Sequence, residues 1–438
     1  MTASSSNSDP YVVPAGRRVD GRVRVPSSKS ITQRFFALAL VGKSEVVVHR
    51  PLLSEDTRLF LGGLAACGFD IEHGSARVTV RPPTGEPPIE REVFCGAGGT
   101  MLRLLTACLA VVPGRSRLDG IARLRERPLG PLIAALEELG VRIRSLEEPG
   151  HAPLEIRGPS LRGGTCELDA SRSSQFLSAL LIAAQAAPRE THITVPSLTS
   201  EPYVDLTLDA IRAFGGEVEV TGPDEHGVRR YRVYPTNLGA SEVWVEADYS
   251  AVAYPAAAAL VTGGVARIEG VVPDSKQGDR HFLELLRQMG AEVTWGEDFV
   301  EVRAGAEGLR AIEADLSTMP DQVPTLAALA PFARGTTRID NVAHLRIKES
   351  DRLRAMSTEL RRLGAEVDER DDGLVIPGVW ADAAPPSEPV VVDSWGDHRI
   401  AMSLALVGLR RPGVSVAEPR VVAKSYPAFW QDVETLIR

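Results

Sequence analysis

The chain has 438 residues, a length that predicts two or three domains at roughly 150 residues each. Its residues are 44% hydrophobic and 24% charged, which is ordinary for a folded globular protein and argues against global disorder. The net charge of −9 leaves no basic surplus, so the composition disfavours a protein whose main partner is a nucleic acid.

The cysteines and the first residues of the chain indicate the compartment. Cys67, Cys95, Cys108 and Cys166 form neither a CxxC pair nor a Cys/His ligand spacing, so we expect no disulfide framework and no zinc site. No apolar run approaches the roughly 18 residues that span a bilayer. Residues 1–10 lack the basic and apolar regions of a signal peptide and are expected to form a disordered lead-in. The sequence therefore predicts a soluble, cytoplasmic protein without membrane contact.

The strongest structural signal is a repeat of about 73 residues. An amphipathic run that ends in glycine and continues into a short β-like stretch, as in LELLRQMGAEV, occurs five times at intervals of 72 to 75 residues. A sixth copy would end near residue 438, where the chain finishes in the helical run PAFWQDVETLIR. The marker glycines are Gly68, Gly140, Gly215, Gly290 and Gly364.

A second series of helix ends runs in phase with the first. Left-handed helix caps favour glycine and proline cannot continue a helix, so we expect Ala- and Leu-rich helices to stop at such residues. Each copy would then hold two helices and several short strands, which indicates one supersecondary unit used six times. Six copies exceed one core, so we predict two halves of three copies each, divided near residue 245. The second series is Gly42, Gly114, Pro188, Gly263, Gly335 and Gly408.

Polar residues cluster at matching places just before these helices. Helix starts present unpaired N–H groups and the positive end of the helix dipole, so they are ready-made anion sites. If symmetry brings them together, their arginines and lysines would create a strongly electropositive site for a small substrate with phosphate and carboxylate groups. The first series is SSKSITQR (27–34), GAGGTMLR (96–103), SRSSQFL (171–177), EADYSA (246–251), MPDQ (319–322) and GDHRI (396–400). The second is SEDTR (54–58), RERP (125–128), SEPY (200–203), QGDR (277–280), HLRIKESDRLR (344–354) and AKSYP (423–427).

Each of these segments also has an ordinary structural interpretation. Lys29 follows a capping serine and could be solvated. Glu349 and Arg352 are three residues apart, as in a surface ion pair on a helix. Asp321 could cap the next helix, and Lys424 could be a surface lysine. Their joint occurrence favours a binding site, because three of only five lysines fall within these segments.

Taken in order, the segments resemble a known family. SSKS, GT..LR, RERP, SSQFLSAL, SEPY, KESDRL, DHRIAM and AKSYP are similar to the motifs of 5-enolpyruvylshikimate-3-phosphate synthases, from about residue 24 to 430. The resemblance implies an α/β fold of two similar domains, each with three copies of a βαβαββ unit, and an active site between them. One lobe would comprise residues 1–27 with 246–438, and the other 28–245.

The activity implied is transfer of the enolpyruvyl group of phosphoenolpyruvate to the 5-hydroxyl of shikimate 3-phosphate, with release of phosphate through a tetrahedral intermediate. It implies a monomer that needs neither cofactor nor metal. The implied catalytic residues are Asp321 as base, with Glu349 and Lys29 sharing the proton for the methylene carbon, and which of the two delivers it is left open. The implied phosphoenolpyruvate ligands are Lys29, Gly99, Thr100, Arg127, Gln175, Arg352, Arg399 and Lys424. The implied shikimate 3-phosphate ligands are Lys29, Ser30, Arg34, Ser173, Ser174, Gln175, Ser200, Tyr203, Asp321, His344 and Lys348.

The sequence departs from the family pattern at a few positions. Ser27 replaces the usual glycine, Gln33 the usual asparagine, and Ala97 with Gly98 alters the segment before Gly99. These changes bear on affinity and inhibitor response more than on the reaction. One alternative is the related UDP-N-acetylglucosamine enolpyruvyl transferase, which typically has a loop cysteine that residues 114–127 lack. The other is a non-catalytic anion-binding relative.

Overall fold

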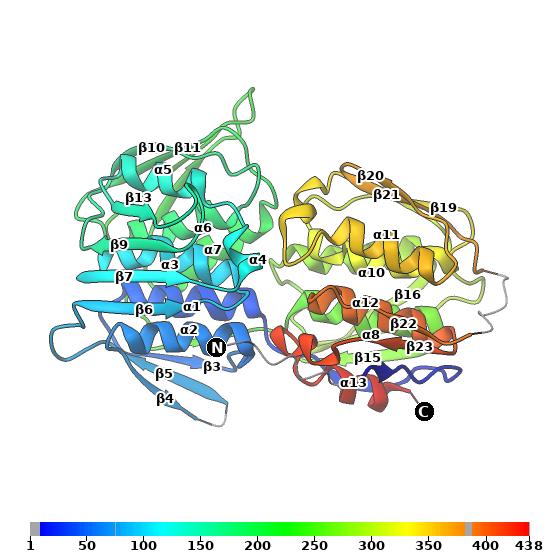
Figure 1. Cartoon of the computed structure of the whole chain (residues 1–438). Coiled ribbons are helices and arrows are strands. Elements are labelled where there is room, and N and C mark those ends of the chain that lie inside the picture. The colour runs from blue at the N-terminus through cyan, green and yellow to red at the C-terminus, as the bar shows by residue number, and fades with distance from the viewer. Residues whose placement is uncertain (1–8, 75, 382–387, 438) are drawn as a thin grey trace. The chain divides into compact units, whose positions relative to one another are not determined.

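The computed structural model describes residues 9–74, 76–381 and 388–437, so most of the predicted disordered lead-in lies outside the described residues. Contacts divide the chain into two compact units (Figure 1). The N-unit contains residues 27–246, and the C-unit contains the described residues up to 26 and from 247 onward. Each unit has its own cluster of buried hydrophobic side chains. No helix among the described residues is long and apolar enough to cross a membrane.

The N-unit contains three four-stranded sheets that share one strand order. The first is β14 (Glu242–Trp244), β3 (Val46–His49), β5 (Arg77–Arg81) and β4 (Asp70–His73). The second is β6 (Glu90–Phe94), β7 (Gly114–Asp119), β9 (Leu154–Gly158) and β8 (Arg142–Ser145), and the third is β10 (Gly164–Glu167), β11 (Thr191–Val195), β13 (Arg229–Val233) and β12 (Val218–Thr221). In each sheet the first two strands are parallel and the third is antiparallel to both neighbours.

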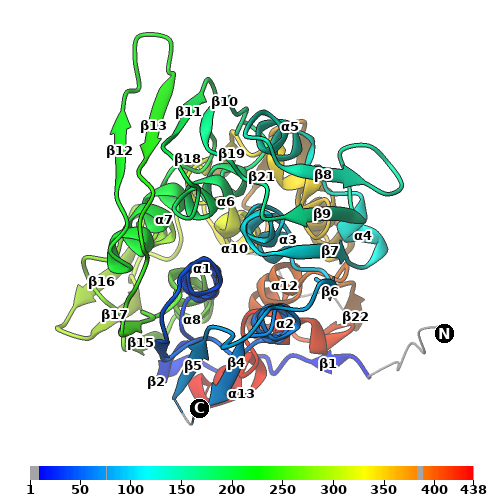
Figure 2. The ribbon, with the colours of Figure 1, turned by 90° about the vertical axis from the view of Figure 1, so that its left-hand side faces the viewer.

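Three helices form the centre of the N-unit. α1 (Lys29–Val41), α3 (Gly99–Cys108) and α6 (Gln175–Ala184) are buried along almost their whole length and pack against one another. Figure 2 shows them enclosed by the sheets. This burial on all sides explains why their sequences are rich in Ala and Leu rather than amphipathic. The other helices are α2 (Glu55–Ala66), η1 (Leu109–Val111), α4 (Ala122–Arg125), α5 (Gly130–Glu138) and α7 (Pro202–Ala213).

The C-unit repeats this plan with one variation. Its first sheet has the order β2 (Asp20–Arg24), β15 (Val265–Glu269), β17 (Phe299–Ala304) and β16 (Ala291–Trp295). The second has the order β18 (Glu313–Asp315), β19 (Thr336–Asp340), β21 (Gly373–Pro377) and β20 (Asp368–Arg370). The third has the order β22 (Val390–Val392), β23 (Val414–Val416) and β1 (Tyr11–Val12). In the third sheet β1 comes from the beginning of the chain and pairs antiparallel with β23. It therefore occupies the position that the last strand of the copy holds in the other sheets.

The C-unit, like the N-unit, has three buried helices at its centre, called inner here, and further helices outside them, called outer. The inner helices α8 (Tyr249–Thr262), α10 (Val323–Leu329) and α12 (His398–Arg410) are buried and pack together. The helix α13 (Phe429–Leu436) confirms the helical run predicted for the sixth copy. The others are η2 (Gly278–His281), α9 (Phe282–Gln288), η3 (Pro320–Gln322), η4 (Ala330–Phe332), η5 (Ala343–Ile347), α11 (Arg352–Arg362), η6 (Pro419–Lys424) and α13 (Phe429–Leu436).

Two strands are exchanged between the copies. β2 precedes α1 in the chain, yet it pairs in parallel with β15, which follows α8. β14 precedes α8, yet it pairs in parallel with β3, which follows α1. Apart from this exchange, and from β1 taking the place of a last strand, each copy has the predicted order βαβαββ. This order confirms the α/β fold.

The glycines of the first series are confirmed as helix ends. Each follows an outer helix with a left-handed φ between 78° and 106°, the conformation in which glycine closes a helix without a Cβ penalty. The second series is only partly right. Gly263 is a left-handed cap of α8, but Gly408 lies inside α12, which continues to Arg410. A Cβ at Gly408 would lie 2.6 Å from the Cβ of Val13, so this glycine serves close packing against the segment after β1.

The close approach at Gly408 makes a stability prediction. Gly408→Ala should lower the free energy of unfolding by about 1–3 kcal/mol, because the added methyl overpacks the contact with Val13. Gly62→Ala, at an exposed position of α2 with nothing within 4 Å of its Cβ, should instead raise it by about 0.5–1 kcal/mol through helix propensity. Denaturant titration measures both, and equal stability of the two variants would contradict the packing argument.

Candidate functional site

Lys29 begins α1 and is held by a carboxylate. Its Nζ lies 3.1 Å from Oδ2 of Asp56, in the first turn of α2. Ser28 caps α1 by accepting a hydrogen bond from the Ile31 amide. Asp56 in turn packs against the turn before α3, since a Cβ at Gly98 would lie 3.4 Å from its Oδ1. Lys29 is therefore not a solvated lysine, and the starts of α1, α2 and α3 lie side by side.

The starts of α3 and α6 are joined by polar side chains. Arg103 donates from Nη1 to Oε1 of Gln175 at 2.7 Å, and Gln175 donates from Nε2 to Oγ1 of Thr100 at 3.0 Å. A Cβ at Gly99 would overlap the guanidinium of Arg127, so only glycine allows this arginine to cover the start of α3. The N-unit therefore places cations and helix N-termini together, a combination that suits anions.

Arg34 is buried at the centre of the N-unit, in the second turn of α1. Its Nε donates to Thr207 at 2.8 Å, and its Nη2 donates to Ser178 at 3.4 Å and to the Tyr203 carbonyl at 2.7 Å. Its Nη1 donates to the Ser30 carbonyl at 3.0 Å. Burial lowers the pKa of Arg34 to about 10, so it remains charged at neutral pH. These bonds hold the candidate residues Ser30 and Tyr203 on neighbouring helices.

The remaining candidates of the N-unit flank the starts of α6 and α7. Ser173 and Ser174 are buried, and Ser173 Oγ accepts the Gln175 amide at 3.3 Å. Ser200 is also buried and adopts a left-handed φ of 52°. A left-handed serine is a strained conformation of the kind that functional sites retain.

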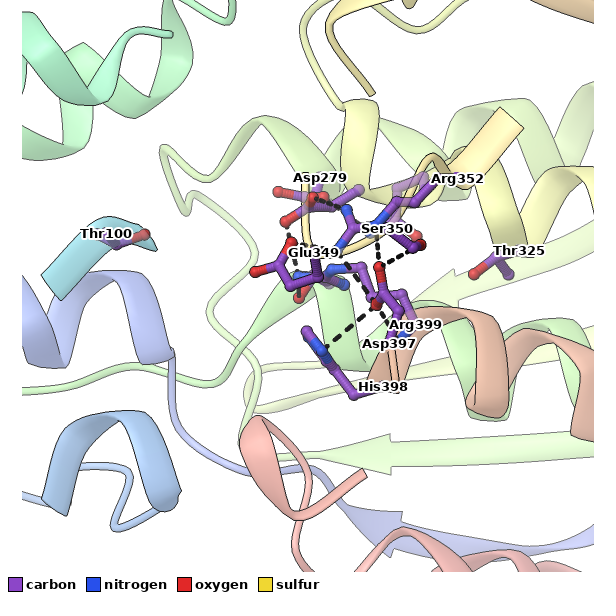
Figure 3. A network of polar contacts seen from close by, with 12 residues as sticks. Thr100, Asp279, Thr325, Glu349, Ser350, Arg352, Asp397, His398 and Arg399 are labelled. Atoms are coloured by element: carbon purple, nitrogen blue, oxygen red, sulfur yellow. Dashed lines mark hydrogen bonds and ion pairs between the residues drawn. The ribbon is translucent and has the colours of Figure 1, made fainter. Parts of the chain in front are cut away.

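Arg352 organises the candidate residues of the C-unit (Figure 3). It begins α11, its side chain is only 2% exposed, and it binds three carboxylates. Nε donates to Asp397 at 2.8 Å, Nη1 to Asp321 at 2.8 Å, and Nη2 to Glu349 at 3.1 Å. Burial opposes the charge on Arg352, but the three carboxylates raise its pKa above the usual range. The guanidinium therefore stays charged.

Asp321 and Glu349 each bridge two cations. Arg399 Nη2 lies 2.7 Å from Asp321 Oδ2, and Lys424 Nζ lies 3.2 Å from Glu349 Oε1. Together with Arg352, three cations thus face three carboxylates. The sequence predicts a strongly electropositive site. The C-unit cluster differs from this prediction, because acidic side chains already neutralise its cations.

Charge determines the protonation states around Asp321. Burial raises its pKa, but the positive charges of Arg399, Arg352 and Lys348 outweigh burial and hold the pKa below the usual range. His344 lies nearby on η5, where burial and then the charge of Lys348 lower its pKa to about 4. At neutral pH Asp321 is therefore an anion and His344 is neutral.

The ordinary interpretations of these segments are wrong for Glu349 and Lys424, and incomplete for Asp397. Glu349 precedes α11 rather than lying on it, and the Arg352 that it pairs with is buried. Lys424 is 5% exposed and therefore not a surface lysine. Asp397 does cap α12, accepting the amide of Arg399 at 2.9 Å, but the same carboxylate also binds Arg352.

Sequence reasoning missed three acidic residues that the structure places in these clusters. Asp56, Asp279 and Asp397 lie within the polar segments noted in the sequence, but none is among the predicted ligands. The available signal was an acidic residue in the first turn of a helix next to a candidate cation. Such a residue caps a helix far more often than it binds a second charge, so the pattern alone did not separate the two roles.

Comparison with known proteins identifies the family. The family model of EPSP synthase (3-phosphoshikimate 1-carboxyvinyltransferase) matches residues 13–433. The chain belongs to the EPSP synthase family. It is 42% identical over 420 residues to the 3-phosphoshikimate 1-carboxyvinyltransferase of Syntrophobacter fumaroxidans, covering 95% of this chain and 97% of that protein. It is 38% identical over 427 residues to that of Vibrio vulnificus, covering 96% of this chain and 97% of that protein.

Solved structures of EPSP synthases share the fold. The EPSP synthase of Acinetobacter baumannii superposes with a TM-score of 0.78 at 27% identity, covering 98% of each chain. The enolpyruvyl transferase NikO of Streptomyces tendae matches with a TM-score of 0.77 at 20% identity, covering 97% of each chain. The second likeness concerns the fold alone.

The contacts of Arg34 predict a large structural effect. Arg34→Ala removes three side-chain and carbonyl bonds that join α1 to α6 and α7, so the free energy of unfolding should fall by about 2–4 kcal/mol. The control is Arg58→Ala, at an exposed position of α2, which should change it by less than about 0.5 kcal/mol. Denaturant unfolding that gives the same midpoint for both variants would contradict this role.

Proposed function

We propose that this protein transfers the enolpyruvyl group of phosphoenolpyruvate to the 5-hydroxyl of shikimate 3-phosphate and releases phosphate. The family supports the reaction. The observation that carries the residue assignment is that Asp321 and Glu349 share the guanidinium of Arg352. This arrangement puts two carboxylates, suited to proton transfer, beside a group that can bind the substrate's phosphate or carboxylate.

Phosphoenolpyruvate is assigned to cations from both clusters. Arg352, Arg399 and Lys424 of the C-unit and Lys29 and Arg127 of the N-unit would bind its carboxylate and phosphate. Arginines suit this task because their planar forks match both anions in two-point contacts. Thr100 and Gln175, which are hydrogen-bonded to each other at the start of α3 and α6, complete the proposed site with Gly99.

Shikimate 3-phosphate is assigned mainly to helix starts of the N-unit. The serines at the start of α6 can donate hydroxyl and amide hydrogens to its phosphate. Asp321 would face the 5-hydroxyl, and the neutral His344 and charged Lys348 would contact the same substrate. The complete proposed set is Lys29, Ser30, Arg34, Ser173, Ser174, Gln175, Ser200, Tyr203, Asp321, His344 and Lys348.

The reaction follows from proton movements among these groups. Asp321 accepts the proton of the 5-hydroxyl as that oxygen bonds to C2 of phosphoenolpyruvate. The methylene carbon C3 takes a proton from Glu349 or Lys29, which gives a tetrahedral adduct. The group that supplied this proton then takes a proton back from C3, the C2–O bond to phosphate breaks with its electron pair leaving on the phosphate, and the enol double bond is restored. Fixed cations stabilise the charge on the phosphate as it leaves.

The ion pairs of the C-unit add a further element to this mechanism. Without substrate, Asp321 is a weak base, because Arg352 and Arg399 hold it ionised. The anionic groups of phosphoenolpyruvate compete for the same arginines. Each arginine that turns to the substrate withdraws positive charge from Asp321 and raises its proton affinity. Substrate binding thus strengthens the base that the reaction needs.

We further propose that the chain forms two lobes, residues 1–27 with 246–438 and residues 28–245. Neither cofactor nor metal is required in this scheme, because cationic side chains neutralise the phosphate. A monomeric state and a cytoplasmic location remain predictions.

Phosphate release tests the proposed function directly. The protein should release inorganic phosphate when it is given both phosphoenolpyruvate and shikimate 3-phosphate, and not with either one alone. Release only with UDP-N-acetylglucosamine as acceptor would assign the other enolpyruvyl transfer. Binding of both substrates without release would indicate a non-catalytic relative.

Removing the proposed base should affect turnover more than binding. Asp321→Ala is expected to reduce kcat by about 10²–10⁴-fold, the usual contribution of a general base. Its affinity for shikimate 3-phosphate, measured by calorimetry, should change far less. Near-normal turnover of this variant would remove Asp321 from the mechanism.

Lys424 should act on phosphoenolpyruvate. Lys424→Ala is expected to raise the KM for phosphoenolpyruvate by about 10–100-fold, the value of one charged hydrogen bond. Lys276→Ala is a matched control, since Lys276 is exposed in the same unit. Steady-state kinetics measure both, and identical KM values would exclude Lys424 as a ligand.

A further inference from the structure

Asp279 is a buried carboxylate that the mechanism above does not use. It lies on η2 and is only 4% exposed. Its Oδ1 accepts a hydrogen bond from Gln322 Nε2 at 2.8 Å, and Gln322 directly follows Asp321 on η3. Figure 3 shows Asp279 beside the cluster around Arg352. A buried carboxylate next to an ion-pair cluster is costly, so its presence calls for a physical reason.

The charged groups that face Asp279 come from three other elements. They are Asp321 on η3, Arg399 on α12, and Asp248, the N-cap of α8. Burial raises the pKa of Asp279 to about 6, the negative charge of Asp321 adds to this, and Arg399 opposes it. The charge of Arg399 therefore acts on both Asp279 and Asp321, and the like charges of the two carboxylates raise the proton affinity of each.

Asp321 acts as a base more readily when a negatively charged group lies nearby. A carboxylate paired with two arginines takes a proton from a hydroxyl poorly, because the arginines stabilise its ionised form. The proposed exchange of Arg352 and Arg399 onto phosphoenolpyruvate removes part of that stabilisation. Asp279 then remains as a nearby negative charge, fixed by its bond to Gln322, that favours protonation of Asp321.

We propose that Asp279 is a positioning residue that acts through Asp321, holding the η3 turn and raising the proton affinity of the base when both substrates are bound. This inference rests on the proposed function. The proton moves from the 5-hydroxyl to the carboxylate of Asp321, and the electron pair of the broken O–H bond forms the new bond to C2. Asp279 supplies negative charge and exchanges no proton with the substrate.

The test is Asp279→Asn, which keeps the shape and an oxygen that can accept from Gln322 but removes the charge. We expect kcat to fall roughly tenfold or more, since one unit of pKa corresponds to a factor of ten. KM for both substrates should stay within about threefold, because Asp279 touches neither. The melting temperature should not fall, since the substitution removes a buried charge and its repulsion with Asp321. Asp274→Asn, at an exposed position five residues upstream, is the matched control.

The pH profile separates this role from a structural one. In the wild type, kcat/KM, which reports the substrate-free enzyme, should decline as pH falls through the region near 6, where Asp279 takes up a proton and its charge is lost. Asp279→Asn should lack this decline while keeping any limb that belongs to Asp321. Values of kcat are normalised to the sites that bind shikimate 3-phosphate in calorimetry, so partly unfolded protein does not imitate the effect.

The outcomes distinguish the two proposals. No phosphate release by the wild type would refute the proposed function itself. An active wild type, with an Asp279→Asn variant whose kcat and pH profile match those of Asp274→Asn, would overturn the role of Asp279. A lower melting temperature with an unchanged pH profile would also overturn it and assign a structural role. If Asp279→Asn does not fold, Asp279→Ser gives the same comparison with a smaller neutral side chain.

Discussion

The buried guanidinium of Arg352 and its three carboxylate partners are the constraint on which the C-unit depends. A buried charge is tolerated only when it is paired and hydrogen-bonded, so Asp321, Glu349 and Asp397 must all approach one side chain. Asp321 on η3 and Glu349 before α11 belong to one copy of the repeat, and Asp397 before α12 belongs to the next, so the pairing brings two copies to a single point. In the proposed mechanism, the same pairing keeps the cations in place for substrate anions and neutralises the cations when no substrate is bound.

The repeat explains how such a point arises. Each copy contributes a buried inner helix, and the inner helices of a unit pack together, so their N-termini gather the polar residues that precede them. The N-unit does this with Lys29, Gly99 and Gln175, and the C-unit with Asp321 and Asp397. Polar side chains at these ends replace the missing backbone partners of the first helical turn, which is why hydroxyls, carboxylates and glycines concentrate there.

Much of the fold could be predicted from the sequence, because some backbone conformations require particular residues at particular positions. The glycines at intervals of 72 to 75 residues mark left-handed helix ends. The exchange of β2 and β14 could not be predicted, because these strands pair with partners far away in the sequence, such as Glu242 with Val47 and Val265 with Asp20. Gly408 was misleading for the same reason, since its partner Val13 lies at the other end of the chain.

The candidate site shows the same limit. Motifs identified most of the clustered residues and the family that they resemble. They did not reveal that Arg399 and Lys424 are already paired with acids, that the pair of Arg352 and Glu349 is buried, or that Asp279 and Asp397 lie beside these groups. An acidic residue before a helix is ambiguous in sequence, and only the tertiary structure shows whether its second oxygen faces a cation. Family resemblance and geometry are therefore complementary here. The family indicates the reaction, and the geometry is the basis for the proposed competition between phosphoenolpyruvate and Asp321 for Arg352 and Arg399.

That competition is open to one direct measurement: a crystal structure of the protein with phosphoenolpyruvate and a shikimate 3-phosphate analogue that lacks the 5-hydroxyl. The account predicts that nitrogens of Arg352 and Arg399 lie about 3 Å from phosphoenolpyruvate oxygens, and that Asp321 has lost at least one of its two arginine contacts. A complex in which Asp321 keeps both arginines, with phosphoenolpyruvate bound elsewhere, would contradict it.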